Sequence, residues 1–207
     1  MAISFDCFGT LVTATQPDAP WTAVADELAV RDVSVPADWD DAYRSSHVTV
    51  ERGAELSLVE HTQAALASRG VEEDPNIVQE ALLAAFDGPI DVREGANDAL
   101  VAAAAAGPVG VLSNCSLPGL VERTLDRADF PAEFDAVVTS VDCGWRKPHD
   151  DAFIAVADAL DVGVESLVHV GDDPRADGGG QTAGATVLLT EDVALTAIPA
   201  WLEDEWR

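Results

Sequence analysis

The spacing of apolar and polar positions changes twice along the chain. Residues 2–6 form a short apolar run that predicts a buried strand ending at Asp6. From about Ala14 to Val92, apolar residues recur at helical spacing without strand-like alternation. After residue 92, short apolar runs alternate with helical segments. The pattern therefore predicts two regions that differ in secondary structure.

The segment 14–92 is expected to hold four helices. Pro36 is expected to open the second, Gly70 to close the third, and Asp74-Pro75 to cap the fourth. Because no strand is expected between them, residues 14–92 are predicted to form an all-helical inserted domain. The apolar faces of the four helices are Trp21, Val24, Ala25 and Leu28; Trp39, Ala42 and Tyr43; Leu56, Val59 and Leu66; and Val78, Leu82 and Phe86.

The rest of the chain predicts an α/β core formed by residues 1–13 and 93–207. Strands separated by helices form parallel sheets that are covered on both faces. The helical insertion interrupts this core directly after its first strand. The expected helices are 94–106, 117–128 and 149–160, and the expected strands are 108–113, 134–140, 166–171 and 185–189, the last after a short helix.

The charge balance is strongly acidic, with 38 Asp and Glu against 11 Lys and Arg and a net charge of -27. An apolar content of 48% argues against a disordered acidic chain. We interpret the charge as adaptation to a salt-rich cytoplasm, because near molar salt the Debye length falls to about 3 Å and like charges stop repelling one another. The same charge argues against a nucleic-acid partner, because phosphates would be repelled.

Membrane and disulfide signals are missing from the sequence. The longest apolar run, 99–106, is too short to span a bilayer, and no basic segment precedes an apolar stretch at the N-terminus. We therefore expect a cytoplasmic protein without a membrane partner; its oligomeric state is not determined by the sequence. Cys7, Cys115 and Cys143 form no CxxC pair, so small apolar packing is favoured over a disulfide, redox or soft-metal role.

Polar side chains follow the predicted strands at their carboxyl ends. They are Asp6 after the first strand, Ser113 and Asn114 after the second, Lys147 after the third, and Asp172, Asp173 and Asp177 after the fourth. Ligands bind beyond these ends in parallel sheets, so we expect Asp6, Asp172 and Asp177 to meet. Three carboxylates repel one another unless a cation lies between them, and oxygen ligands suit magnesium.

The same group of residues is suited to phosphoryl transfer. That chemistry needs a cation, a fixed positive charge, a hydroxyl donor and a carboxylate held in line. Lys147 is the chain's single lysine, which favours a functional role for it. Each residue alone has a simpler explanation as a helix cap, a turn or a solvated loop. Their placement at four strand ends favours a shared site.

Four motifs, in order along the chain, resemble the haloacid dehalogenase (HAD) superfamily. They are Asp6-Cys7-Phe8-Gly9-Thr10-Leu11, Ser113-Asn114, Gly144-Trp145-Arg146-Lys147-Pro148 with Phe153, and Gly171-Asp172-Asp173-Pro174-Arg175-Ala176-Asp177. The resemblance covers essentially the whole chain. It implies a Rossmann-like core with a mobile helical cap, and a small-molecule substrate.

The resemblance also implies roles for individual residues. It implies that Asp6 is a covalent nucleophile, that Ser113 and Lys147 bind the transferred group, that Thr10 and Asn114 contact the substrate, and that Asp6, the backbone carbonyl of Phe8, Asp172 and Asp177 hold Mg²⁺.

Phe8 bears on the type of reaction, because phosphatases and dehalogenases of this superfamily differ at its position. Phosphatases of this superfamily usually carry a second Asp at this position, which protonates the leaving group, whereas dehalogenases carry an aromatic residue and need no metal. Loss of a general acid typically costs about 100- to 10,000-fold in rate. Without a metal, however, Lys147 alone would offset Asp6, Asp172 and Asp177. We favour a magnesium-dependent phosphatase acting through an aspartyl-phosphate; a haloacid dehalogenase and a non-catalytic binding protein are the alternatives.

Two sets of side chains are secondary candidates. A histidine could replace the missing acid, although each one is more typical of a structural position. Arginines of the insertion could meet an anionic substrate or pair with neighbouring carboxylates. The histidines are His47, His61, His149 and His169, and the arginines are Arg31, Arg44 and Arg52.

Overall fold

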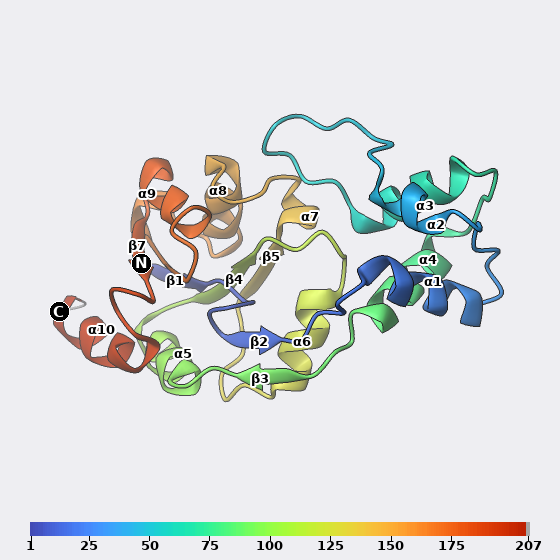
Figure 1. Cartoon of the computed structure of the whole chain (residues 1–207). Coiled ribbons are helices and arrows are strands. Elements are labelled where there is room, and N and C mark those ends of the chain that lie inside the picture. Colours follow the sequence, from blue (N-terminus) through green and yellow to red (C-terminus); the bar gives the residue numbers. More distant parts are fainter. Residues whose placement is uncertain (206–207) are drawn as a thin grey trace.

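The computed structural model describes residues 1–205 and combines an α/β core with a helical insertion (Figure 1). Five strands form one parallel sheet in the order β5-β4-β1-β6-β7. This sheet confirms the predicted α/β, Rossmann-like class. Its strands are β1 (Ala2–Phe5), β4 (Val109–Ser113), β5 (Ala136–Thr139), β6 (Leu167–Gly171) and β7 (Thr186–Leu189).

Helices cover both faces of the sheet. Successive strand residues point to opposite faces, so Ile3 and Phe5 are buried on the side of α5 (Ala96–Ala106) and α10 (Ile198–Glu205). The opposite face is covered by α8 (Asp150–Ala159) and α9 (Gly180–Ala183), as Figure 1 shows. The central strands β1, β4 and β6 are therefore buried on both sides, whereas the edge strands β5 and β7 are only partly buried.

The insertion contains four helices that pack against one another. The fourth begins as predicted, because the Asp74 carboxylate accepts a hydrogen bond of 2.8 Å from the Asn76 N–H. The second begins at Trp39 rather than at Pro36, and the Trp39 indole N–H donates to the Trp21 carbonyl at 2.8 Å. The helices are α1 (Pro20–Val30), α2 (Trp39–Arg44), α3 (Leu58–Ala67) and α4 (Pro75–Ala85).

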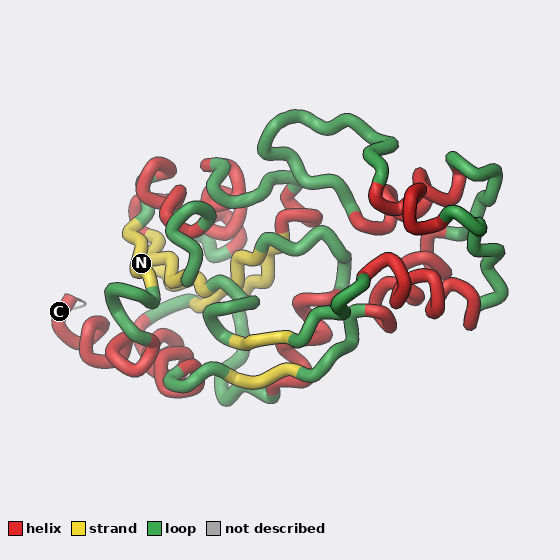
Figure 2. The backbone as a smooth tube through the Cα atoms, in the orientation of Figure 1, coloured by secondary structure: helices red, strands yellow, loops and turns green. Residues whose placement is uncertain are grey.

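The prediction that residues 14–92 are helical throughout is wrong at both ends. Strands β2 (Val12–Ala14) and β3 (Ile90–Val92) pair antiparallel and form a ribbon between the core and the insertion (Figure 2). Strands this short show no clear alternation, and their pairing joins segments far apart in the chain, so periodicity does not detect them. The boundary predicted at residues 13/14 falls within β2, and the one predicted at 92/93 falls at the end of β3.

A second connection joins the insertion to the core. The long segment 45–57 between α2 and α3 returns to the core, as Figure 2 shows. The Glu55 N–H donates to the Gly144 carbonyl at 2.8 Å, and the Arg146 N–H donates to the Gly53 carbonyl at 2.9 Å. The insertion therefore holds the loop that leads directly into the single lysine.

Shorter elements complete the core. The remaining helical segments are α6 (Leu120–Ala128), α7 (Ser140–Cys143), η1 (Val164–Ser166), η2 (Asp177–Gly179) and η3 (Leu195–Ala197).

None of the helices within residues 1–205 has the length and apolar character needed to cross a membrane.

Candidate active site

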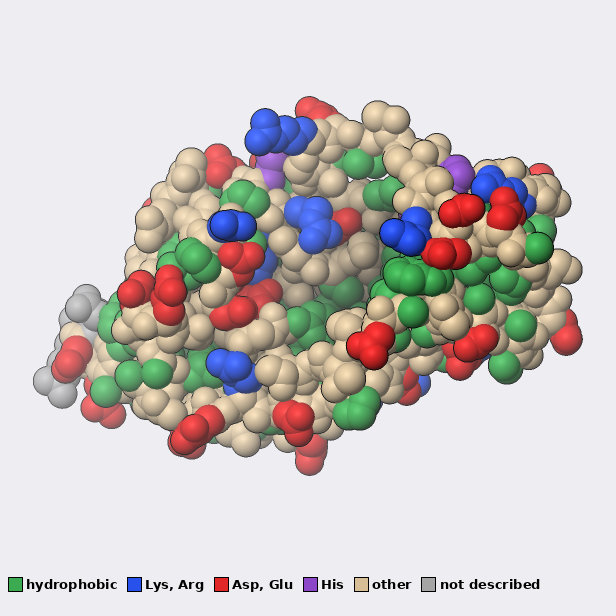
Figure 3. All heavy atoms as spheres, viewed as in Figure 1, with side chains coloured by type: hydrophobic (Ala, Val, Ile, Leu, Met, Phe, Trp, Pro, Cys, Tyr) green, Lys and Arg blue, Asp and Glu red, His purple; other side chains and the backbone are tan. Residues whose placement is uncertain are grey.

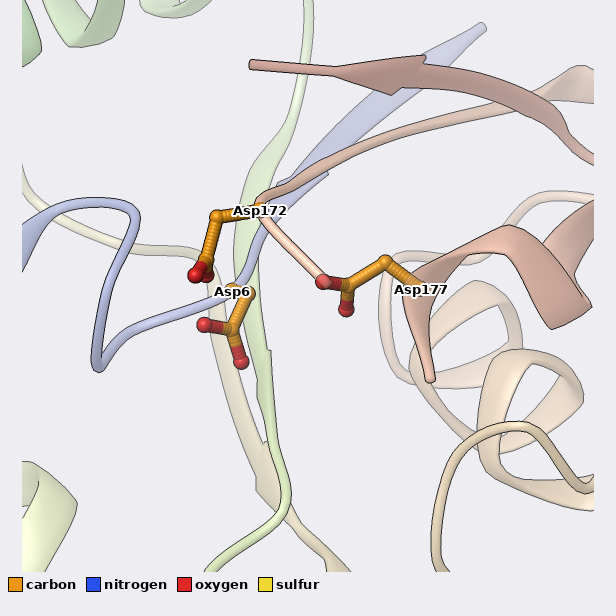
Figure 4. A group of neighbouring side chains, drawn as sticks. All are labelled: Asp6, Asp172 and Asp177. Atoms are coloured by element: carbon orange, nitrogen blue, oxygen red, sulfur yellow. The ribbon is translucent and has the colours of Figure 1, made fainter. Parts of the chain in front are cut away.

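Three carboxylates meet at the carboxyl edge of the sheet. Asp6 directly follows β1, Asp172 directly follows β6, and Asp177 begins η2. Strands β1 and β6 are neighbours at the point where the strand order reverses, which is where such sheets bind ligands. One oxygen from each carboxylate lies within 4.8 Å of the others. In Figure 4, the Asp177 carboxylate is directed toward those of Asp6 and Asp172, so the three carboxylates lie together as expected.

Two glycines leave room for these carboxylates. Gly9 has a φ of +101°, and a Cβ atom there would lie 2.5 Å from Oδ2 of Asp172. A Cβ atom at Gly171 would likewise clash with the side chain of Asp177. The Thr10 hydroxyl donates to Oδ1 of Asp172 at 2.9 Å and fixes its orientation. The glycines of the first and fourth motifs are therefore required by the carboxylates beside them.

Lys147 is the counter-charge to two of the carboxylates. Its Nζ atom lies 2.7 Å from Oδ1 of Asp6 and 2.6 Å from Oδ1 of Asp177, and it donates to the Leu112 carbonyl at 2.7 Å. Burial lowers the pKa of Lys147, but Asp6 and Asp177 outweigh this effect and raise it overall. The single lysine therefore stays charged at neutral pH, beside the predicted nucleophile.

The pKa values of Asp6 and Asp177 are shifted in opposite directions. Burial raises the pKa of Asp6 to about 6; Lys147 opposes the rise, and Asp177 and Asp172 add to it. Burial also acts to raise the pKa of Asp177, but its hydrogen bond from His169 and the charge of Lys147 outweigh burial and lower it. A cation beside Asp6 would favour its ionised form. Three converging carboxylate oxygens are the hard ligands that magnesium takes, so the residues present fit this ion.

A buried chain of hydrogen bonds runs from Ser4 through His169 to the Asp177 carboxylate. Nδ1 of His169 lies 2.9 Å from the Ser4 hydroxyl oxygen, and Nε2 lies 3.0 Å from Oδ1 of Asp177. Burial, with a smaller effect of Lys147, lowers the pKa of His169 to about 4. The ring is therefore neutral at pH 7 and donates from Nε2 to Asp177 while Nδ1 accepts from Ser4. His169 positions a carboxylate and does not itself line the cleft.

The carboxylates open into a cleft of about 290 Å³ that Ser113, Phe8 and Arg146 also line. It lies in the hollow between the core and the insertion that Figure 3 shows. Asn114 lines the cleft too, but its Oδ1 accepts from the Lys147 N–H at 2.8 Å and its Nδ2 donates to the Lys147 carbonyl at 2.9 Å. Both halves of this amide hold the backbone of the lysine.

The other histidines have partners away from the cleft. Nε2 of His47 and of His61 each lies 2.7 Å from a main-chain carbonyl oxygen of the insertion. His149 caps α8, and its ring stacks on Trp145 with the ring centroids 4.0 Å apart. Within residues 1–205, the cleft lining contains no histidine that could replace the missing acid.

The three cysteines are free. Cys7 and Cys115 are buried in the hydrophobic core. Burial raises the pKa of Cys115 to about 11, and burial, then the charge of Asp6, raises that of Cys7. Because a thiolate is the reactive form, these two residues are packing groups.

Sequence reasoning missed two residues beside the cleft, Arg146 and Glu55. Nη1 of Arg146 lies 2.5 Å from Oε2 of Glu55, whose side chain is only 5% exposed. The Ser140 hydroxyl donates to the same carboxylate. The only signal in the sequence was an arginine directly before the single lysine of a chain that is poor in basic residues.

Comparisons with known proteins identify the family of the chain. A family model described as haloacid dehalogenase-like hydrolase matches residues 1–184. No curated protein matches the chain significantly.

Solved structures share the fold over most of the chain. A 2-haloacid dehalogenase from Pseudomonas syringae pv. tomato DC3000 has a TM-score of 0.65 at 18% identity and covers 99% of both chains. A HAD phosphatase from Thermococcus onnurineus has a TM-score of 0.54 at 17% identity, over 91% of this chain and 85% of the other. A putative HAD hydrolase from Bacillus subtilis, bound to magnesium, has a TM-score of 0.55 at 17% identity, over 98% of this chain and 97% of the other. At these identities, the likeness shows the fold alone.

Proposed function

Because the chain belongs to the haloacid dehalogenase-like hydrolases, we propose that it is a magnesium-dependent phosphatase for a small phosphorylated metabolite. One observation carries the proposal: three carboxylates converge within 4.8 Å, with the ammonium of Lys147 in contact with only two of them. A halide-releasing site needs one nucleophilic carboxylate, whereas this cleft has three that converge. The extra carboxylates are explained if they hold a cation that shares the phosphoryl group with Lys147.

Asp6, Asp172 and Asp177, together with the backbone carbonyl of Phe8, would hold the magnesium ion. When bound, the ion neutralises negative charge on the phosphoryl oxygens. Two neighbouring residues would keep the ligating carboxylates in place, since Thr10 donates a hydrogen bond to Asp172 and His169 donates one to Asp177. The Bacillus subtilis hydrolase that shares this fold binds magnesium, which supports the same assignment.

Covalent catalysis then proceeds on Asp6. Its carboxylate attacks phosphorus, an aspartyl-phosphate forms, and the bond to the leaving oxygen breaks. Lys147, which already bonds Oδ1 of Asp6, and Ser113 bind the transferred group. Water then cleaves the ester and restores the carboxylate. The predicted substrate contact of Asn114 would use the second N–H of its amide, beside the bond to Lys147. The Thr10 hydroxyl is buried and already donates its single proton to Asp172, so we assign Thr10 to positioning that carboxylate.

Phe8 favours a second candidate function, dehalogenation of a haloacid. It lines the cleft at the position where a phosphatase would carry its acid, and a halide leaves without a proton. The solved 2-haloacid dehalogenase with a TM-score of 0.65 supports this alternative. Asp6 would then displace the halide from carbon and form an ester that water cleaves. A protein that binds a ligand without turning it over is the third alternative.

One substrate panel separates the three functions. We expect para-nitrophenyl phosphate to be hydrolysed with magnesium, not with chelator, and again when magnesium is restored. Asp172→Asn should abolish the magnesium-stimulated hydrolysis. Asp126→Asn, which changes an exposed carboxylate on α6, should leave it unchanged. Halide release from chloroacids that is indifferent to chelator would instead establish the dehalogenase. Binding without turnover of either substrate would establish the third alternative.

The charge of the chain supports a cytoplasmic setting rich in salt. Its formal charge is -27, and acidic side chains are spread over the face drawn in Figure 3. Assays are therefore best made in about 2 M KCl, where like charges on the surface are screened. The same charge supports a small-molecule substrate over a nucleic acid.

A further inference from the structure

The backbone of Arg146 is fixed by the insertion. Its N–H donates to the Gly53 carbonyl at 2.9 Å, and the neighbouring Glu55 N–H donates to the Gly144 carbonyl at 2.8 Å. Ala54 and Trp145 form an isolated antiparallel bridge between these two bonds. The residue before the catalytic lysine is therefore held on a short ladder that joins the insertion to the core.

The side chain of Arg146 is fixed as well. Nη1 lies 2.5 Å from Oε2 of Glu55, a nearly buried carboxylate that also accepts from the Ser140 hydroxyl. A guanidinium has five N–H donors, and the bond to Glu55 uses one of them. The Arg146 side chain is 43% exposed, so further donors remain open to the cleft. A guanidinium held this way loses little entropy when it binds a second anion.

Arg146 stands between two adjoining hollows. It lines the catalytic cleft with the carboxylates, and it also lines a second hollow of about 520 Å³ with Arg52, Pro148 and His149. Lys147 lines both hollows, so a molecule whose phosphoryl group sits beside Lys147 can extend past Arg146. Figure 3 shows Lys and Arg side chains around the hollow on this face.

Arg52 adds charge to the second hollow. The other two insertion arginines named from the sequence are engaged elsewhere, since Arg31 pairs with Glu27 and Arg44 with Asp40. Arg52 has no ion pair within the described residues, and it lies in the segment that carries Glu55. Arg52 and Arg146 therefore both line the second hollow, in a chain whose acidity would otherwise repel an anion.

We infer that Arg146 is a specificity-determining residue that binds a second anionic group of the substrate. The substrate class is then a phosphate monoester that carries a carboxylate or a second phosphate a few atoms from the ester oxygen. Glu55 is a positioning residue that orients the guanidinium, and Arg52 adds to the positive electrostatic potential in the second hollow. This assignment rests on the proposed phosphatase function, since Lys147 and the metal bind the first phosphoryl group.

The test uses non-hydrolysable alkyl phosphonates that end in a methyl group, a carboxylate or a phosphate. Their affinities are measured by calorimetry with magnesium and about 2 M KCl, so turnover is not required. The wild-type chain should bind one anionic-ended compound about 10- to 100-fold more tightly than the methyl-ended one. The better of the two anionic ends identifies the second group.

Matched variants assign the preference to Arg146. In Arg146→Gln the ratio of the anionic-ended to the methyl-ended affinity should fall to about one. Arg146→Lys should restore part of it, and Glu55→Gln should weaken it while leaving the methyl-ended affinity in place. Arg69→Gln, which removes an arginine paired with Asp38 on the insertion surface, is the control and should change nothing.

Several outcomes would overturn the inference. These are equal affinity for all three compounds in the wild type, no binding of any of them, or a parallel loss for all three in Arg146→Gln. The proposed function has a separate readout, the magnesium-dependent hydrolysis of para-nitrophenyl phosphate, which carries no second anion. Hydrolysis without the binding preference therefore rejects the Arg146 assignment alone.

Discussion

The ammonium of Lys147 lies 2.7 Å from Oδ1 of Asp6, and both side chains are nearly completely buried. The lysine therefore occupies one oxygen of the proposed nucleophile and holds the carboxylate in a single orientation. Asp6→Asn keeps the shape of the side chain but removes its nucleophilicity. We expect it to lower the turnover of para-nitrophenyl phosphate by at least about 1,000-fold while the folded chain is retained.

A circular dichroism spectrum and a cooperative thermal transition of Asp6→Asn would show that the fold is intact. Asp126→Asn serves as the control for loss of a carboxylate elsewhere. Turnover of Asp6→Asn near that of the wild type would exclude an ester on Asp6.

The burial of Asp6 also predicts how stability depends on pH. Its pKa is raised from 3.8 in the unfolded chain to about 6 in the folded one, so the folded state binds the proton more tightly. The Asp6 contribution is therefore present below about pH 4 and is lost as pH rises toward 6. In chelator, the unfolding free energy of the wild type should fall over this range relative to Asp6→Asn, by up to about 3 kcal/mol.

Denaturant titrations of both proteins at several pH values measure this difference. The comparison with the variant cancels other groups that titrate nearby, His169 among them. Magnesium should reduce the loss in the wild type, because a cation favours the ionised carboxylate. A difference between the two proteins that does not change with pH would contradict the raised pKa.

Phe8 predicts a dependence on the leaving group. A phosphatase without a general acid handles acidic leaving groups best, because these depart without a proton. Phe8→Asp should therefore raise kcat/KM for alkyl phosphates by about 10-fold or more, and raise it much less for aryl phosphates. Phe8→Leu is the matched control, since it removes the ring without supplying an acid. An equal gain for both ester classes would remove this explanation of Phe8.

Much of the site follows from local sequence signals. An apolar run that stops at Asp6 indicates where a strand ends, and the order of strands and helices indicates a parallel sheet. Those two signals are enough to predict that Asp172 and Asp177 lie beside Asp6. The HAD-like motifs then add candidate roles that strand ends alone do not specify.

Other features depend on contacts between distant residues, and periodicity does not encode these. The β2–β3 ribbon pairs Val12 with Val92, and its strands are too short to alternate visibly. The ion pair of Arg146 with Glu55 joins the core to the returning segment of the insertion. The buried bond between His169 and Asp177 likewise required the fold, because only packing removes this histidine from water.

Asn114 provides a final prediction, because its amide bonds the backbone of Lys147 on both sides, at 2.8 Å and 2.9 Å. Asn114→Ala would leave a backbone donor and an acceptor of the lysine without these partners. We expect a loss of about 1–3 kcal/mol in unfolding free energy and a fall in kcat, because the ammonium is no longer held beside Asp6.

Kinetics on Asn114→Ala can separate this positioning role from the substrate contact that the sequence suggested. A side chain that only holds the lysine should lower kcat with little change in KM, whereas a direct substrate contact should also raise KM. Asn76→Ala, which removes an exposed amide from the start of α4, controls for a lost asparagine. Unchanged stability together with a higher KM would assign Asn114 to the substrate rather than to Lys147.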